Sequence, residues 1–125
     1  MSRTRPIHVS FVIDTLSRAG TESQLLALIR GLDRNKVQPS LVLLNGLNDE
    51  SRELEPEHCP ILRLGLSRLV GANTFRATAR VWKFWQHHRP DVVQSYFLDS
   101  SYFSIPLARL ARIPTVIRVR NNLGY

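Results

Sequence analysis

The sequence predicts an α/β domain of the Rossmann-like, three-layer kind, with a mostly parallel sheet of about five strands. Two observations carry this prediction. Apolar runs typical of buried strands alternate along the chain with segments whose apolar residues recur at helical spacing. The length of 125 residues suits one domain with a sizeable core. Because parallel strands are joined by crossovers, the alternation predicts β–α–β units with helices on both faces of the sheet.

The first unit shows the pattern most clearly. Residues 7–14 (IHVSFVID) form a nearly continuous apolar run, as expected for a strand covered on both faces. A helix is predicted over residues 21–32, and Thr21 and Gln24 have the spacing of a capping box at its start. The residues expected on its inward face are Leu25, Leu28, Ile29 and Leu32. A strand leading into a capped helix directs backbone N–H groups and the positive dipole end to one point, which suits a phosphate.

The rest of the chain continues the alternation. Further strands are predicted over residues 38–44, 60–64, 91–95 and 114–119. The acidic residues 45–60 are predicted to form a solvated loop with at most one helical turn. A long helix over residues 73–89 must stop at Pro90, and its expected inward stripe is Phe75, Thr78, Ala79, Trp82 and Trp85. A helix over residues 99–111 contains Pro106, which should kink it or delay its start to about Ser104.

The composition favours anionic partners. The formal net charge of +7 suits phosphate esters, an acidic lipid surface or nucleic acid. Fifteen of the 17 cations are Arg, so a GC-rich genome would give the same excess, and both interpretations stay open. The polar residues His8, Ser10 and Asp14 interrupt the first apolar run, so it is neither a signal peptide core nor a membrane span. We therefore expect a cytoplasmic protein, at most peripheral at the inner face of a membrane.

Metal and nucleophile chemistry have little support. Cys59 is the only cysteine, which excludes an internal disulfide, and no third group is evident to make it a nucleophile. His87 and His88 are adjacent and cannot share a helix face, so no metal spacing is present and no cofactor is predicted. The turn at residues 17–22 is not GxGxxG, and no GxxxxGK[ST] occurs, so dinucleotide and P-loop enzymes are poorly supported.

Two groups of polar residues are candidates for binding. Gln94, Tyr96 and Asp99 follow the fourth strand and combine hydrogen-bonding groups with an aromatic face, which suits a sugar or polyol; alternatively, Asp99 only caps the next helix. Arg76, Arg80 and Lys83, with His87, share one face of the long predicted helix. That face either contacts anionic lipid or is simply solvated, and nucleic acid is the less favoured partner.

Four segments in order together resemble the N-terminal, acceptor-side domain of GT-B glycosyltransferases of family 4: VIDTLSRAGTESQLLALIRGLDR, SLVLLNGL, ILRLGL and RPDVVQSYFLDSSYFSIPLARLARIPTVIRVRN. The resemblance covers nearly the whole chain in order. It implies half of a GT-B fold, and a retaining, metal-independent transfer from a nucleotide-diphosphate sugar to a lipid, glycan or small polyol. The second domain of such enzymes holds most of the donor and carries a pair of glutamates spaced E-x7-E, which this chain lacks.

The resemblance also implies site residues. Gly20 and Thr21 correspond to a glycine loop beside the donor diphosphate, and Arg120 and Asn121 match an RN dipeptide. Gln94 and Tyr96 fall where many members carry two histidines in an H-[ST]-H pattern; this chain has neither, so no catalytic residue is assigned. Residues 1–125 are then a single acceptor-side domain, truncated at its C-terminal end and inactive alone. The alternative is a non-catalytic α/β module that binds a phosphorylated ligand or a protein partner.

Overall fold

The computed structural model describes residues 6–16, 20–46, 48–65, 72–96 and 105–119, without the side chains of 72–74. Its strands are β1 (Ile7–Ile13), β2 (Val37–Leu43), β3 (Ile61–Arg63), β4 (Val92–Tyr96) and β5 (Thr115–Val119). Its helices are α1 (Gly20–Gly31), α2 (Asp49–Glu53) and α3 (Ala72–His88). Residues 105–110 are also helical.

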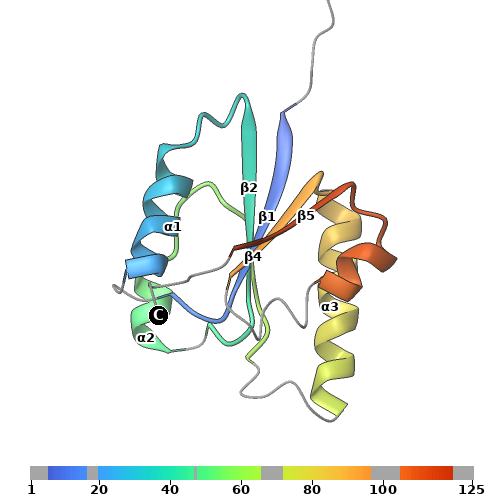
Figure 1. Cartoon of the computed structure of the whole chain (residues 1–125). Helices are drawn as coiled ribbons and strands as arrows, with labels where there is room; N and C mark the ends of the chain where they lie inside the picture. The colour runs from blue at the N-terminus through green and yellow to red at the C-terminus, as the bar shows by residue number, and fades with distance from the viewer. Residues whose placement is uncertain (1–5, 17–19, 47, 66–71, 97–104, 120–125) are drawn as a thin grey trace, which may run out of the picture.

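The five strands form one sheet in the order β3-β2-β1-β4-β5, and every neighbouring pair is parallel. α1 and α2 cover one face, whereas α3 and the helical residues 105–110 cover the other (Figure 1). These observations confirm the predicted α/β, Rossmann-like class. The chain order reverses at β1, between β2 and β4, so the carboxyl end of β1 is the switch point at which such sheets bind ligands.

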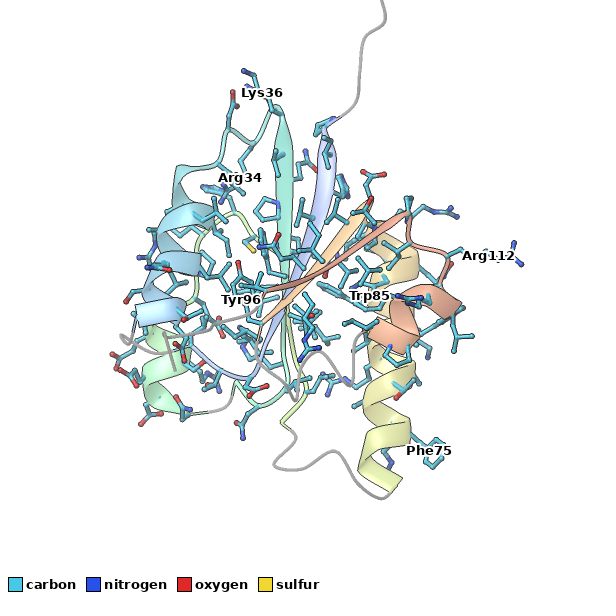
Figure 2. The ribbon with its side chains drawn as sticks, viewed as in Figure 1. Arg34, Lys36, Phe75, Trp85, Tyr96 and Arg112 are labelled. Atoms are coloured by element: carbon cyan, nitrogen blue, oxygen red, sulfur yellow. The ribbon has the colours of Figure 1, made fainter. Side chains whose placement is uncertain are left out.

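Each face of the sheet has its own core, because alternate residues of a strand point to opposite faces. Phe11 and Ile13 of β1 pack in the cluster on the α1 side, whereas Val12 packs in the cluster on the α3 side. Tyr96 of β4 belongs to the first cluster and Trp85 of α3 to the second, and Figure 2 shows them on either side of the sheet. β1 is thus covered on both faces, as its apolar run predicts.

The inward faces of two helices differ from the prediction. In α1, Leu26 is buried and Leu28 is 45% exposed. In α3, Ala77, Val81 and Trp85 face the sheet at steps of four residues, whereas Phe75 is 81% exposed and Trp82 39% exposed. The prediction is therefore right for Trp85 and wrong for Phe75 and Trp82. The smaller residues Ala77 and Val81 occupy the positions where the helix packs on the sheet.

A hydrogen bond from Trp85 joins α3 to the central strand, β1. Its indole Nε1–H donates to Ser10 Oγ at 2.9 Å, and both side chains are buried. This contact explains why a serine stands in the middle of an apolar strand: its hydroxyl satisfies a buried donor that would otherwise be costly. The Ser10–Trp85 bond therefore sets which residue of α3 lies over β1.

Hydrogen bonds of His8 join the start of β1 to neighbouring elements. Its Nδ1–H donates to the carbonyl oxygen of His88 at 2.7 Å, at the end of α3. Its backbone N–H donates to Asp91 Oδ2 at 3.0 Å, and the Asp91 N–H donates back to the His8 carbonyl at 2.8 Å. The start of β1 is thus joined to the end of α3 and to the start of β4.

We predict that Trp85→Phe lowers the free energy of unfolding by about 1–3 kcal/mol in urea denaturation, because it leaves the buried Ser10 hydroxyl without its donor. Adding Ser10→Ala should restore part of the loss, since removing both partners leaves no unsatisfied group. Trp82→Phe, on the exposed side of the same helix, is the control and should change stability by less than about 0.5 kcal/mol. Equal losses for Trp82→Phe and Trp85→Phe would contradict the assignment.

Gly46 permits a tight turn after β2, and a second prediction follows from its geometry. Its φ is +76°, and an added Cβ would lie 2.8 Å from Leu43 Cβ. Gly46→Ala should therefore lower the free energy of unfolding by roughly 1–3 kcal/mol. Gly31→Ala is the matched control, because a Cβ there meets nothing within 4 Å; stability should stay the same or rise by up to about 1 kcal/mol. Thermal unfolding of both variants checks the difference.

Candidate functional site

The carboxyl ends of β1, β2 and β3 continue as a bonded row beyond the sheet. Leu44 N–H donates to the Ile13 carbonyl at 3.0 Å, and Asn45 N–H to the Asp14 carbonyl at 2.8 Å. Gly65 N–H then donates to the Asn45 carbonyl at 3.0 Å. These bonds join the first residues that follow β1, β2 and β3, so they fix the backbone at the switch-point edge of the sheet.

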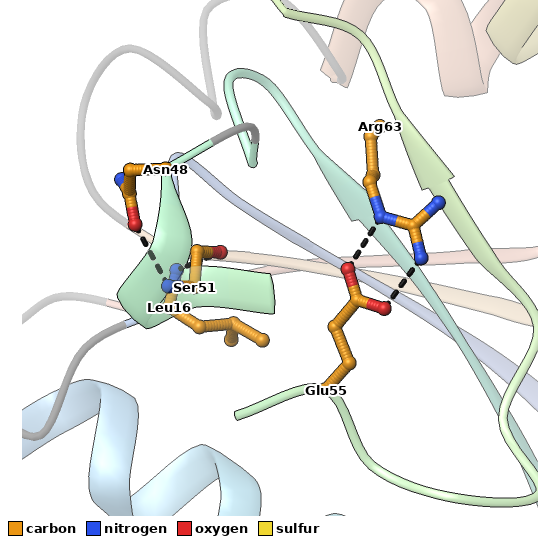
Figure 3. Close-up of polar contacts among 5 residues, drawn as sticks. All are labelled: Leu16, Asn48, Ser51, Glu55 and Arg63. Atoms are coloured by element: carbon orange, nitrogen blue, oxygen red, sulfur yellow. Dashed lines mark hydrogen bonds and ion pairs between the residues drawn. The ribbon is translucent and has the colours of Figure 1, made fainter. Parts of the chain in front are cut away.

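The short helix α2 holds the segment that leads from β1 toward the glycine turn. Ser51, which is buried, accepts a hydrogen bond from Leu16 N–H on its Oγ at 3.1 Å (Figure 3). Asn48 donates from Nδ2 to Thr15 Oγ1 at 3.2 Å, and its Oδ1 caps α2 by accepting from Ser51 N–H at 2.7 Å. One helix of five residues thus fixes Thr15 and Leu16.

These contacts were missed by sequence reasoning, which predicted residues 45–60 to be a solvated loop with at most one turn. The turn is confirmed, but the segment is not simply solvated. A signal was available: Asn48 is a favoured N-cap residue, and Asp49 and Glu50 follow it in the first turn, where carboxylates suit the helix dipole.

A salt bridge between Glu55 and Arg63 is a second contact that stabilises this edge. Both carboxylate oxygens of Glu55 accept from the Arg63 guanidinium, through Nε–H and Nη2–H (Figure 3). The hydrogen bond from Arg63 to Glu55 raises the pKa of Arg63 above its usual value. The paired side chains join the segment after α2 to the end of β3. Glu55 is therefore a bound carboxylate, in contrast to the solvated one that the sequence predicted.

The start of α1 is open beside Gly20. Gly20 is exposed, and a Cβ added to it would meet nothing within 4 Å. The helix begins at Gly20, so Thr21 lies in its first turn. The predicted capping box is therefore wrong, because Thr21 lies inside the helix and is not its N-cap. The first turn of α1 still presents backbone N–H groups at the carboxyl edge of the sheet.

Gln94 and Tyr96 lie on the same face of β4 and contact each other. Gln94 Nε2–H donates to Tyr96 Oη at 2.7 Å. Tyr96 is only 7% exposed, and its burial raises the pKa of the phenol, although the bond from Gln94 lowers it. The Tyr96 ring belongs to the core, so it does not present the aromatic face that was expected for a sugar. Asp99, Arg120 and Asn121 lie outside the described residues.

A pocket of about 290 Å³ lies at the opposite, amino edge of the sheet. Its lining includes His8, Arg34, His58 and His88, and sequence reasoning did not foresee it. The Arg34 guanidinium donates to four backbone carbonyls, those of Ile29, Leu32, Glu57 and His58, at 2.6–3.3 Å. Arg34 thus connects the end of α1 to the segment before β3.

Cys59 lies next to this pocket in the chain and is not a reactive thiol. Burial raises its pKa to about 12, although the nearby Arg34 charge lowers it. At neutral pH the thiol therefore stays protonated, and the thiolate is the form that attacks or ligates. Among the described residues no group of three His, Cys, Asp or Glu side chains is placed to hold a metal ion. Within the same residues, no helix has both the length and the apolar character needed to cross a bilayer.

Comparisons with known proteins agree with this architecture. The family model described as "Glycosyl transferase 4-like domain" matches residues 19–125. Among solved structures, the chain is similar to MurG of Acinetobacter baumannii, with a TM-score of 0.66 and 21% identity over 90% of this chain. At that identity the likeness shows the fold, and the chain spans 35% of the length of MurG. No curated protein matches the sequence.

The fold is thus that of one GT-B glycosyltransferase domain. Because the family model covers most of the sequence, this chain belongs to the family of glycosyl transferase 4-like domains.

Proposed function

We propose that the chain is the acceptor-side domain of a glycosyltransferase, which moves a sugar from a nucleotide-diphosphate sugar to a lipid, glycan or small polyol. The observation that carries the proposal is the family match over residues 19–125. The parallel sheet supports it, because the open start of α1 lies at the switch-point edge, where this class of sheet binds ligands.

In this proposal two domains divide the work. A second domain, outside these 125 residues, holds most of the donor, so residues 1–125 alone do not transfer sugar. The acceptor-side domain positions the acceptor hydroxyl and helps to stabilise the charge that develops on the departing diphosphate. The backbone N–H groups at Gly20 and Thr21 are suited to the second task, since they carry the positive end of the α1 dipole.

Gln94 and Tyr96 are suited to the acceptor. The raised pKa keeps the Tyr96 phenol protonated at neutral pH, and its oxygen already accepts from Gln94. The Tyr96 O–H therefore remains a donor and the Gln94 carbonyl oxygen an acceptor, a combination that matches a sugar or polyol hydroxyl. We assign Asp99 to the same substrate site because it follows the fourth strand in the sequence, and Arg120 and Asn121 on the family resemblance alone.

We also propose a cytoplasmic location with peripheral contact at the inner face of a membrane. Arg76, Arg80 and Lys83 are all exposed on α3. Cations in such a position favour an anionic lipid surface, which in turn would favour a membrane-bound acceptor.

The start of α1 can be tested with inorganic pyrophosphate as the probe for a diphosphate. We expect titration of the ¹⁵N-labelled chain to shift the amide signals of Gly20 and Thr21 first. Gly20→Glu should weaken binding at least about tenfold, because a carboxylate would stand beside the anion. Gly31→Glu adds the same charge at the other end of α1, where a side chain also has open space, and should leave binding unchanged.

Equal pyrophosphate affinity in the two variants would contradict the role of the α1 start. The coding sequence that follows residue 125 tests the enzymatic part of the proposal separately. A second α/β segment with E-x7-E is expected there, whereas its absence would favour a non-catalytic module that binds a phosphorylated ligand.

A further inference from the structure

The pocket at the amino edge of the sheet lies where the pairing of β2 with β3 ends. Leu64 N–H donates to the Leu43 carbonyl and Leu41 N–H to the Pro60 carbonyl, both at 2.9 Å. The next bond of this ladder toward the amino edge would run from the nitrogen of Pro60 to the carbonyl of Pro39, and a proline nitrogen carries no hydrogen. The Pro39 carbonyl therefore receives no donor from β3, and both prolines line the pocket.

Ser40 adds a buried hydroxyl to the same lining. The residue is only 6% exposed, and within the described part of the chain its hydroxyl forms no hydrogen bond. Ser10, which is paired with Ser40 in the register of β1 and β2, shows the usual situation, because its hydroxyl accepts from Trp85. A ligand in the pocket would give the Ser40 hydroxyl the partner that the fold does not supply.

Two histidines add to the hydrogen-bonding character of the pocket. A carbonyl oxygen only accepts, so the bond from His8 to the His88 carbonyl places a proton on His8 Nδ1. In the neutral ring, His8 Nε2 is then an acceptor. Burial and the neighbouring His87 and His8 lower the pKa of His88, so the His88 ring is neutral at neutral pH. With the Pro39 carbonyl and the Ser40 hydroxyl, His8 Nε2 makes three acceptors in the lining.

Arg34 lines the pocket as well, but it is poorly suited to an anion. Its guanidinium already donates to four backbone carbonyls, so little of its hydrogen-bonding capacity remains for a ligand. A guanidinium whose N–H groups are engaged can still stack its planar face on an aromatic ring. The rings of His58, Pro60 and Pro90 add further flat surface to the lining.

We propose that the amino-edge pocket binds a neutral, planar nitrogen heterocycle with an exocyclic amino group, of the class of the aminopurines. The acceptors of the lining match the N–H groups of such a ring, and the flat side chains match its faces. The volume of about 290 Å³ is near the lower limit of small-molecule pockets, which suits a single ring system. A phosphate is a poor match, because its oxygens would face acceptors.

This site goes beyond the proposed function. It lies at the amino edge of the sheet, whereas the start of α1 and the proposed substrate site lie at the carboxyl edge. A heterocycle in the pocket would not compete with the acceptor or with the departing diphosphate. Its binding can therefore be measured, and can fail, without bearing on sugar transfer.

The experiment is titration of the ¹⁵N-labelled chain with adenosine up to about 10 mM, which covers the weak affinity expected of a single ring system. We expect saturable shifts of the amide signals of His8, Ser40 and His58, with those of Gly20 and Thr21 unchanged. Purine riboside, which lacks only the amino group, should bind at least about fivefold more weakly, because the acceptors lose their donor. Adenosine monophosphate should bind no more tightly than adenosine.

Ser40→Ala tests the role of the buried hydroxyl. It should weaken adenosine binding at least about fivefold, but it should keep the parent unfolding midpoint, because the hydroxyl has no bond within the described chain to lose. Gly20→Glu, the variant that tests the start of α1, is the control and should bind adenosine as the parent chain does. Ser40→Ala should in turn keep the parent affinity for pyrophosphate.

The proposal would be overturned by any of three results. One is that adenosine produces no saturable shifts, or shifts only the signals of Gly20 and Thr21. Another is that Ser40→Ala binds adenosine as tightly as the parent chain. The last is that purine riboside or inorganic phosphate shifts the same amino-edge signals with an affinity equal to that of adenosine.

Discussion

The structure depends on the complete enclosure of β1. Parallel strands pair with it on both edges, and helices cover both of its faces. A polar side chain left without a partner in that position costs about 1–3 kcal/mol, which is a large share of the stability of a small domain. Ser10 has Trp85 as its partner, and this bond and the one from His8 to the His88 carbonyl together join α3 to the strand.

The carboxyl edge is organised by contacts that are local in space but distant in sequence. Ser51 accepts from Leu16 across 35 residues, and Asn48 reaches Thr15 across 33. Backbone hydrogen bonds from Asn45 to Asp14 and from Gly65 to Asn45 also hold this edge together. α2 and its N-cap residue thus hold Thr15 and Leu16, the last described residues before α1. A binding site built on such supports needs little reordering when a ligand arrives, which lowers the cost of binding.

The sequence was sufficient for the fold because its signals are strong and periodic. The enclosed run of β1 and the stop at Pro90 lie where they were predicted, and all pairs of strands are parallel. It was insufficient for side-chain direction. The predicted inward stripe of α3 included Phe75 and Trp82, although the row through Ala77 and Val81 permits a closer approach to the sheet.

The same limit applied to the site. The contacts of Asn48 and Ser51 depend on a five-residue helix, which is too short to show a periodic pattern in the sequence. The amino-edge pocket is formed by loops that come together only in the folded chain. The substrate roles of Gly20, Thr21, Gln94 and Tyr96 stay predictions. Their positions, in contrast, are now known: at the start of α1 and on one face of β4.

The two edges of the sheet offer anions different environments. At the amino edge the guanidinium of Arg34 already donates to the carbonyls of Ile29 and Leu32. Part of its positive charge therefore already interacts with the negative end of the α1 dipole. His8 is likewise committed to the carbonyl of His88. At the carboxyl edge, the N–H groups of Gly20 and Thr21 precede the first intrahelical hydrogen bond of α1, and a Cβ added at Gly20 would meet nothing within 4 Å. These differences support the proposal that a diphosphate binds at the start of α1 and not in the amino-edge pocket.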